Sequence, residues 1–246
     1  KGLVGSEMCI RDRLSSVGIT NLWVYKTLRV AVVSSGNELI KSGKKIKDHQ
    51  VYDSNKYQII HFLKKFNISV HDLGILKDDE VKVDKFYKKN QNKFDIIISS
   101  GGSSFSSKDY ISSFLSQNTE LLFKYVRIQP GRPVIFSKLK FNYYFSLPGN
   151  PLAVFTNLFF LVSLFIDPSR KDNSSITKFY QSGFSENKKS NLTKFYRVKL
   201  SKNILYTHNS KGSAKLISLS EADGLAFVPE GNDKIKKGEK IRFIEF

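Results

Sequence analysis

The N-terminal part of the chain alternates between short apolar runs and longer stretches in which apolar residues recur at helical spacing. Residues 28–34 form an apolar run typical of a parallel strand that is covered on both faces. A helix is predicted next, because Asp53 or Ser54 can cap it and its apolar residues recur with helical periodicity at Ile59, Ile60, Leu63 and Phe66. A strand at 68–73, a helix that ends near Asn90 and a strand at 94–99 follow. This β-α-β-α-β order predicts a doubly wound α/β domain with a mostly parallel sheet and right-handed crossovers.

Another helix is predicted after two short strand candidates at 134–136 and 143–145. Within Leu147–Pro151, Asn150 suits the N-cap and Pro151 the first helical position, so we expect the helix to run from there to Ile166. Its apolar run is interrupted by polar residues and is shorter than the roughly 20 residues that a membrane span requires. We therefore expect a buried helix and no membrane partner.

The pattern changes after a polar stretch at 167–175, which contains Pro168 and two adjacent serines and is typical of a linker. Beyond it, glycines separate short apolar runs at 195–200, 215–218, 225–228 and 240–244, as expected of a small β domain. We therefore assign residues 14–170 to the α/β domain and residues 171–246 to a C-terminal β domain.

Residues 1–13 differ from the rest, because they show neither helical nor strand periodicity. Their run GSEMCIRD resembles a translated sequencing adapter. We expect a non-native leader here and leave it out of the fold prediction.

Composition places the chain among globular proteins, since 40% of its residues are hydrophobic and 25% are charged. The single cysteine, Cys9, cannot form an internal disulfide, and the four histidines lack the spacing of a zinc site. No basic stretch followed by an apolar one resembles a secretion signal. We expect a reducing, cytoplasmic setting.

The net charge of +18 raises the question of nucleic acid, because 40 basic side chains face 22 acidic ones. The excess is spread along the whole chain and forms no basic stripe. A distributed excess is a weak electrostatic footprint, so we expect no nucleic-acid partner.

Acidic or glycine-rich segments follow each of the first three predicted strands. They contain Glu38, then Asp78, then Gly101 and Gly102 among serines, with Asp109 soon after. Ligands of open α/β sheets bind beyond the carboxyl ends of the strands, where these segments should meet. The glycines could simply turn the chain, or they could form a cradle for an anion. The absence of GxGxxG and GxxxxGKS/T sequences argues against an ordinary dinucleotide domain or a P-loop.

The carboxylates also have two interpretations. Singly, Glu38, Asp78 and Asp109 could each cap a helix or lie in its first turn. Together beside an anion cradle, they offer the carboxylate oxygens that Mg²⁺ takes along with phosphate oxygens. The sequence thus favours a metal-assisted reaction at a phosphate.

Six motifs in a fixed order then resemble the molybdopterin molybdenumtransferases, the family of MoeA and of the gephyrin E domain. They are Arg29–Leu39, Tyr52–Asn55, Leu73–Ile75 with Asp78 and Asp79, Ser100–Gly102 with Asp109 and Tyr110, Gln129–Pro133, and Leu147–Pro151. The segments Leu219–Leu225 and Pro229–Gly231 are similar to the C-terminal β domain of that family. The resemblance covers residues 14–246 and implies a chain that lacks the first two domains of the family.

The resemblance implies insertion of molybdate into adenylylated molybdopterin, with Mg²⁺ as cofactor and release of AMP, in a cleft shared by the two subunits of a homodimer. It implies catalytic and metal-binding roles for Glu38, Asp78 and Asp109. It implies substrate or cofactor binding by a larger set of residues: Ser100, Gly101, Gly102, Ser104, Arg132, Pro148, Gly149, Asn150, Pro151, Arg197 and Ser213.

Three residues depart from the family pattern: Asn37 stands where an Asp is usual, Ser106 where a glycine is, and Gln129 where a lysine is. Arg132 and Arg127 keep positive charge near the lost lysine, and arginine can bind phosphate oxygens with two parallel hydrogen bonds. Two other functions stay open. One is a molybdopterin adenylyltransferase, against which the β domain argues, and the other is a molybdopterin-binding module without turnover.

Overall fold

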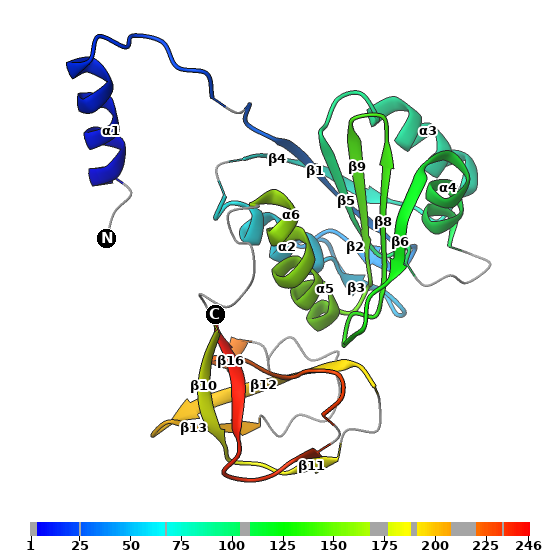
Figure 1. Ribbon diagram of the computed structural model, residues 1–246. Coiled ribbons are helices and arrows are strands. Elements are labelled where there is room, and N and C mark those ends of the chain that lie inside the picture. Colours follow the sequence, from blue (N-terminus) through cyan, green and yellow to red (C-terminus); the bar gives the residue numbers. More distant parts are fainter. Residues whose placement is uncertain are drawn as a thin grey trace.

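The computed structural model describes residues 4–24, 26–66, 68–103, 109–167, 177–187, 191–207, 220–232 and 234–246. Figure 1 shows an α/β domain, a smaller β domain next to the helix labelled α5, and a separate N-terminal helix. The predicted order of an α/β domain followed by a β domain is confirmed.

The α/β domain is built on a six-stranded sheet in the order β4-β1-β5-β9-β8-β6. These strands are β1 (Arg29–Ser35), β4 (Ser69–Leu76), β5 (Ile96–Ser100), β6 (Glu120–Tyr125), β8 (Pro133–Leu139) and β9 (Asn142–Leu147). The pairs β4–β1, β1–β5 and β5–β9 are parallel, whereas β8 and β6 pair antiparallel at one side. The sheet is therefore mostly parallel, as predicted.

Helices cover both faces of this sheet, which explains the apolar runs of its central strands. Val30 and Val32 of β1 pack in a core with α2 (Asn55–Leu63), whereas Ala31 and Val33 pack with α3 (Glu80–Asn90) and α4 (Tyr110–Asn118). Because successive side chains of a strand point to opposite faces, one run supplies both cores.

The apolar segment after residue 150 is a helix with a change of pitch in its middle. It consists of α5 (Pro151–Asn157), a π-helical turn η1 (Leu158–Val162) and α6 (Ser163–Ile166), so the predicted extent is confirmed. The Asn150 side chain caps α5 by accepting hydrogen bonds from the backbone N–H groups of Leu152 and Ala153. In the described residues no helix is long and apolar enough to cross a membrane.

The β domain is a closed barrel. Its strands are β10 (Thr177–Ser182), β12 (Thr193–Ser201), β13 (Ile204–Thr207), β14 (Gly224–Val228) and β16 (Lys240–Glu245). They pair in the order β13-β10-β16-β14-β12, and a further β12–β13 pairing closes the ring. The predicted runs at 195–200, 225–228 and 240–244 lie in β12, β14 and β16, whereas 215–218 and the linker from 168 lie outside the described residues.

Short strand pairs complete the fold. They are β2 (Leu39–Ile40) with β3 (Val51–Tyr52), and β11 (Glu186–Asn187) with β15 (Lys234–Ile235). A further strand, β7 (Ile128–Gln129), leaves the α/β domain to pair in parallel with β12 of the barrel.

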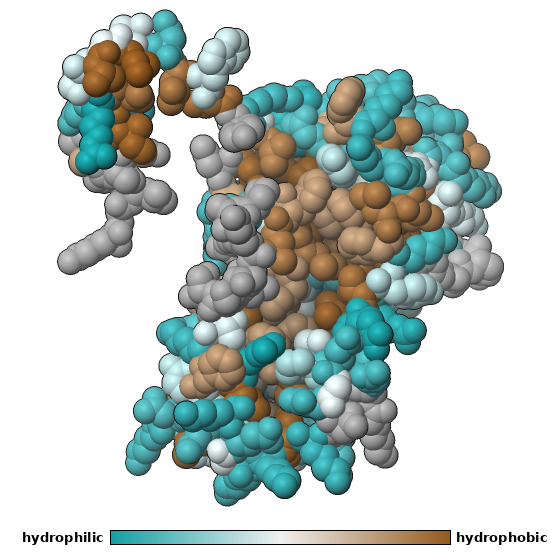
Figure 2. Space-filling view, viewed as in Figure 1, coloured by the Kyte–Doolittle hydropathy of each residue, from teal (hydrophilic) through white to brown (hydrophobic). Residues whose placement is uncertain are grey.

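The two domains also share an apolar core. Leu152 of α5 clusters with Phe195, Leu225 and Phe227 of the barrel, and the ring of Phe160 lies 4.5 Å from that of Phe195 between centroids. Figure 2 shows apolar side chains gathered on the face above the β domain, where Figure 1 places α5 and α6. The junction is thus held by both β pairing and aromatic packing.

Residues near the N-terminus form a helix that the sequence pattern does not predict. This helix, α1, spans Val4–Ser16, and Figure 1 shows it apart from both domains. Hydrophobic periodicity predicts helices that bury an apolar face, and the described side chains from Cys9 to Arg13 are all exposed. The leader therefore has secondary structure, while its non-native origin stays a prediction.

Candidate functional site

The site lies where the order of the parallel strands reverses. From β1 the chain moves to β4 on one side and then returns past β1 to β5 on the other, so the loops after β1 and β5 diverge. A pocket of about 290 Å³ opens between these loops. Its lining contains all three predicted acids and all three predicted glycines: Ser35, Gly36, Glu38, Asp78, Gly101, Gly102, Asp109, Tyr110, Ile111 and Gly149.

Gly101 and Gly102 must be glycines because of backbone conformation and close contact. Both have positive φ angles, +85° and +82°. A Cβ on Gly101 would lie 2.4 Å from the carbonyl oxygen of Ser35, and a Cβ on Gly102 would lie 2.8 Å from Cβ of Ile111. The Gly101 N–H donates to Leu147 O at 2.9 Å, so this amide supports the loop and is not offered to a ligand. Gly101 thus lets the floor of the pocket approach β1 closely, and Gly102 lets it approach α4.

Asp78 is held in the pocket by the loop after β1. Its carboxylate accepts hydrogen bonds from Ser35 Oγ at 2.9 Å and from the Asn37 N–H at 3.2 Å. In return, the Asp78 N–H donates to Asn37 Oδ1 at 3.2 Å. The amide oxygen of Asn37 therefore accepts this hydrogen bond without a negative charge.

The neighbouring Asp79, rather than Asp78, caps the following helix. Asp79 Oδ1 accepts from the Lys82 N–H at 2.9 Å. This backbone hydrogen bond, with further help from the charge of Lys82, lowers the pKa of Asp79. The expected alternative of a helix-capping acid thus applies to Asp79 and leaves Asp78 to the pocket.

Asp109 both caps a helix and lines the pocket. Its carboxylate caps α4 by accepting from the Ser112 N–H at 2.9 Å, and it lines the pocket although the residue is only 5% exposed. Tyr87 of α3 is buried nearby, and its pKa is raised, mainly by burial and also by electrostatic interaction with Tyr144 and Asp109, against the effect of a hydrogen bond with Ser99. Asp109 is thus a buried acid at the edge of an aromatic core.

Glu38 lies across Gly36. A Cβ on Gly36 would be 2.7 Å from each carboxylate oxygen of Glu38, so a side chain at this position would displace the Glu38 carboxylate. Glu38 also lines a second pocket of about 290 Å³ on the other side of the loop after β1. No group of three or more His, Cys, Asp or Glu among the described residues is close enough to hold a metal ion by itself.

The second pocket contains a residue, Asn55, that single-residue patterns did not identify. Asn55, at the start of α2, donates from Nδ2 to Ser100 Oγ at 2.9 Å and to the Gly149 carbonyl at 2.7 Å. It thereby ties the end of β5 to the Pro148–Pro151 loop, and Gly149 and Pro151 line this pocket. The signal was present only in the Tyr52–Asn55 motif of the family resemblance.

A buried ion pair supports the same wall. Asp53 accepts from Ser34 Oγ at 2.9 Å, and its other oxygen lies 3.6 Å from Lys56 Nζ, which also pairs with Asp72 at 3.2 Å. Lys56 and Asp53 are each only 1% exposed. Because burying one of these charges alone is costly, the pair fixes the end of β1 against α2.

The two predicted arginines do not line the first pocket. Arg132 lies just before β8, further along the same edge of the sheet, and lines an open pocket of about 480 Å³ with Tyr125, Arg127 and Asn191 among others. Arg197 lies on β12 of the barrel, where partial burial lowers its pKa. Ser104, Ser106 and Ser213 lie outside the described residues.

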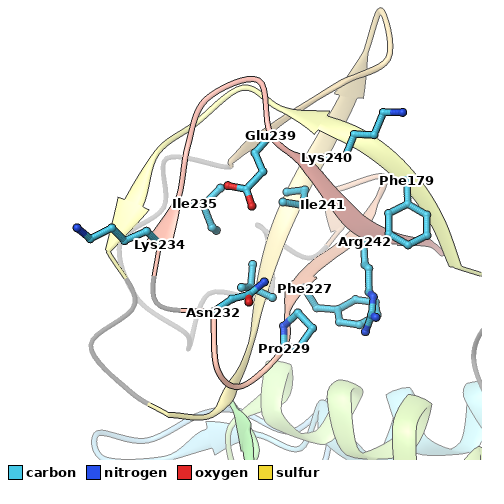
Figure 3. Close-up of a pocket in the computed structure, with 11 residues that line it drawn as sticks. Phe179, Phe227, Pro229, Asn232, Lys234, Ile235, Glu239, Lys240, Ile241 and Arg242 are labelled. Carbon is cyan, nitrogen blue, oxygen red and sulfur yellow. The ribbon is translucent and has the colours of Figure 1, made fainter.

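The barrel has a hollow of its own, of about 220 Å³ (Figure 3). Figure 3 shows the Glu239 side chain turned toward Ile235 and Ile241, with Arg242 beside Phe227. The guanidinium carbon of Arg242 lies 5.8 Å from the centroid of the Phe227 ring. None of the site residues predicted from the sequence lines this hollow.

Comparison with known proteins matches both domains. Residues 31–167 match the family model described as "probable molybdopterin binding domain", and residues 181–246 match the "MoeA C-terminal region (domain IV)". The first match alone spans more than half of the chain. The chain belongs to the MoeA family. The family resemblance of the sequence is confirmed, and the MoeA-type second match covers the β domain that argues against an adenylyltransferase.

Curated MoeA-family relatives share part of their length with this chain. The molybdopterin molybdenumtransferase of Haemophilus influenzae is 35% identical over 149 residues, which cover 61% of this chain and 37% of the relative. That of Nostoc sp. is 27% identical over 238 residues, covering 90% of this chain and 54% of the relative. The chain thus spans about half, or less, of these relatives.

A solved MoeA structure shows the same fold. The molybdopterin biosynthesis MoeA protein from Pyrococcus horikosii superposes with a TM-score of 0.79 at 27% identity, covering 97% of this chain and 59% of that one. The match includes both domains, so their succession in this chain is that of the MoeA family.

Proposed function

We propose that this chain carries the substrate-binding part of a molybdopterin molybdenumtransferase, which inserts molybdate into adenylylated molybdopterin and releases AMP. The curated relatives that bear this enzyme name support the reaction. The observation that carries the proposal is the pocket between β1 and β5, whose lining brings Glu38, Asp78, Asp109, Gly101 and Gly102 together from segments far apart in the sequence.

The donor chemistry of this pocket fits Mg²⁺ shared with a substrate. Glu38, Asp78 and Asp109 offer only oxygen ligands, and Mg²⁺ is commonly bound by one or two carboxylates together with substrate phosphates and water. This arrangement agrees with the finding that no described cluster of three such side chains holds a metal alone. When bound, Mg²⁺ would offset the negative charge of the phosphoanhydride.

The protein groups then have separate tasks. Ser35 and Asn37 hold Asp78 toward the pocket, and the cap of α4 holds Asp109 at its opposite side. Arg132, exposed on the same sheet edge, binds anionic oxygens of the substrate beyond the first pocket. We propose that the pocket acids and Arg132 contact opposite ends of one extended substrate.

The finer assignments follow from the family resemblance. We propose a cytoplasmic homodimer in the full-length protein, with Arg197 and Ser213 facing the partner's site. The position of Arg197 on the barrel, away from the pocket of its own α/β domain, supports such a shared cleft. Sedimentation analysis of the full-length protein tests the dimer, and a monomer would exclude it.

The function is tested by AMP release from adenylylated molybdopterin in the presence of molybdate and Mg²⁺. We expect this chain to bind the substrate but to turn it over poorly, and a longer chain with the additional domains of the relatives to turn it over fast. Positioning of reacting groups can contribute roughly 7 to 11 kcal/mol to catalysis, and a shared cleft would lose much of this when incomplete. Binding without AMP release by the longer chain would instead show a binding module.

A further inference from the structure

The loop that carries Arg132 is held by two buried polar side chains of α5. Thr156 and Asn157 are each 0% exposed and lie at the end of α5, directly before the π-helical turn η1. Neither residue touches the pocket between β1 and β5. Buried polar groups cost stability unless they are paired, so their partners indicate what they are for.

Thr156 binds the loop through its hydroxyl. Three carbonyl oxygens surround Thr156 Oγ1, those of Pro130 at 2.9 Å, Ala153 at 3.0 Å and Leu152 at 3.2 Å. A hydroxyl has one hydrogen to donate, and the shortest of these contacts leaves the helix for the loop. The side chain therefore links α5 to Pro130.

Asn157 binds the next residue of the loop. Its Nδ2 donates to the Gly131 carbonyl at 3.1 Å and to the Ala153 carbonyl at 2.8 Å. Consecutive carbonyl groups of the loop are thus held by consecutive side chains of one helix.

Two further features complete this clamp. The Arg132 carbonyl accepts from the Val126 N–H at 3.0 Å, which fixes the loop from the opposite side. A Cβ on Gly131, whose φ is +110°, would lie 2.8 Å from both Thr156 Oγ1 and Asn157 Nδ2, so only glycine lets the loop approach α5 this closely. The backbone that bears Arg132 is therefore anchored at three successive residues.

We propose that Thr156 and Asn157 are positioning residues, which hold the backbone of Arg132 so that its exposed guanidinium meets the anionic oxygens of the substrate. The proposal rests on the proposed function, because it assumes that Arg132 binds substrate. Neither residue is a catalytic residue, since both act through the loop. The buried clamp places this exposed side chain on a fixed base, which lowers the entropy lost on binding.

The test compares the affinity of this chain for adenylylated molybdopterin, measured by calorimetry, among matched variants. Arg132→Ala should weaken binding by roughly tenfold, as expected for the loss of one charge-assisted hydrogen bond. Thr156→Val keeps the shape of the side chain but removes the hydroxyl, and it should cause a large part of this tenfold loss of affinity. Thr156→Ser keeps the hydroxyl and should bind as tightly as the wild type.

The double variant separates positioning from a general loss of structure. If Thr156 acts through Arg132, Thr156→Val should cause no further loss in the Arg132→Ala background. Gly131→Ala provides a second route, because it displaces the loop while both donors remain. Thr119→Val is the matched control, since Thr119 Oγ1 donates to a carbonyl of its own helix, α4, and should leave binding unchanged.

The outcomes distinguish the two proposals. If Arg132→Ala binds as tightly as the wild type, the substrate-binding role of Arg132 is wrong, and the clamp proposal falls with it. If Arg132→Ala weakens binding but Thr156→Val and Gly131→Ala do not, the proposed function stands and the positioning role is overturned. The positioning role would also be overturned if Thr156→Val weakened binding by the same factor in the wild type and in the Arg132→Ala variant.

Discussion

A single carboxylate in this molecule can cap a helix and line the pocket at the same time. Asp109 caps α4 and also lines the pocket, so the two interpretations of such an acid are not exclusive. Asp78 and Asp79 divide the roles between adjacent positions, because only Asp79 reaches the first turn of α3. Substitutions must therefore remove charge while they preserve the capping hydrogen bond.

Asp109→Asn and Glu38→Gln each remove one carboxylate charge with little change of shape. Asn is as good an N-cap as Asp, so Asp109→Asn should keep α4 intact. Glu38→Gln keeps the size of a side chain on a surface loop. We expect each variant to lower AMP release by the longer chain at least about a hundredfold, and to shift the melting temperature by only a few degrees. Loss of the folded state in either variant, seen by calorimetry, would support a purely structural role for that acid.

At the scale of elements, long apolar patterns were predictable and local exceptions were not. The run at 28–34 and the cap at Asn150 predicted β1 and α5 because burial and capping act on neighbouring residues. The strand β6 was not predicted, since it lies at the edge of the sheet and its short apolar run, Leu121–Phe123, is flanked by the charged residues Glu120 and Lys124. The Asn55 and Thr156 contacts join residues more than 20 positions apart, so no local pattern shows them.

The starts of β1 and β5 are joined by one carboxylate. Asp95 accepts from the Arg29 N–H at 2.7 Å and lies 3.1 Å from Lys26 Nζ. Partial burial raises its pKa, but the hydrogen bonds from Arg29 and Lys26 outweigh burial, so the pKa lies below its ordinary value. Its stabilising effect is therefore present above the pKa of the unfolded state and is lost as pH falls through the folded-state pKa.

We expect Asp95→Asn to lower the free energy of unfolding by about 1 to 2 kcal/mol at neutral pH. The difference from the wild type should shrink as the pH falls below about 4, where Asp95 of the unfolded state takes up its proton first, and should be smallest below the lower folded-state pKa, where Asp95 is protonated in both states. Urea titrations at several pH values measure this. Asp84→Asn is the control, because the exposed Asp84–Lys88 pair on α3 should contribute little. A constant difference across this range would show that the charge of Asp95 is not the source of its effect.

At the scale of the whole molecule, the junction decides whether the two domains behave independently. The polar stretch from Asp167 to Ser175 predicts a linker, which alone would allow independent domains. Against this, β7 pairs with β12, and the Arg127 side chain forms an ion pair with Glu230 at 2.7 Å. The same β7 leads into the clamped Arg132 loop, so the junction and the proposed substrate site share a segment.

Phe160→Ala tests how strongly this junction couples the domains. The Phe160 ring packs against Phe195 at 4.5 Å and Phe227 at 5.8 Å between centroids, and truncation of such a ring costs about 3 kcal/mol. We expect the wild type to unfold in one calorimetric transition and the variant in two, because the barrel and the α/β domain each keep their own core.

After limited proteolysis in the predicted linker, the wild-type fragments should stay together on a sizing column and those of the variant should separate. Phe141→Ala, at a side chain that is 91% exposed, should behave as the wild type. If the Phe160 variant also unfolds in one transition and its fragments co-elute, then β pairing and the ion pair, rather than the aromatic packing, hold the two domains together.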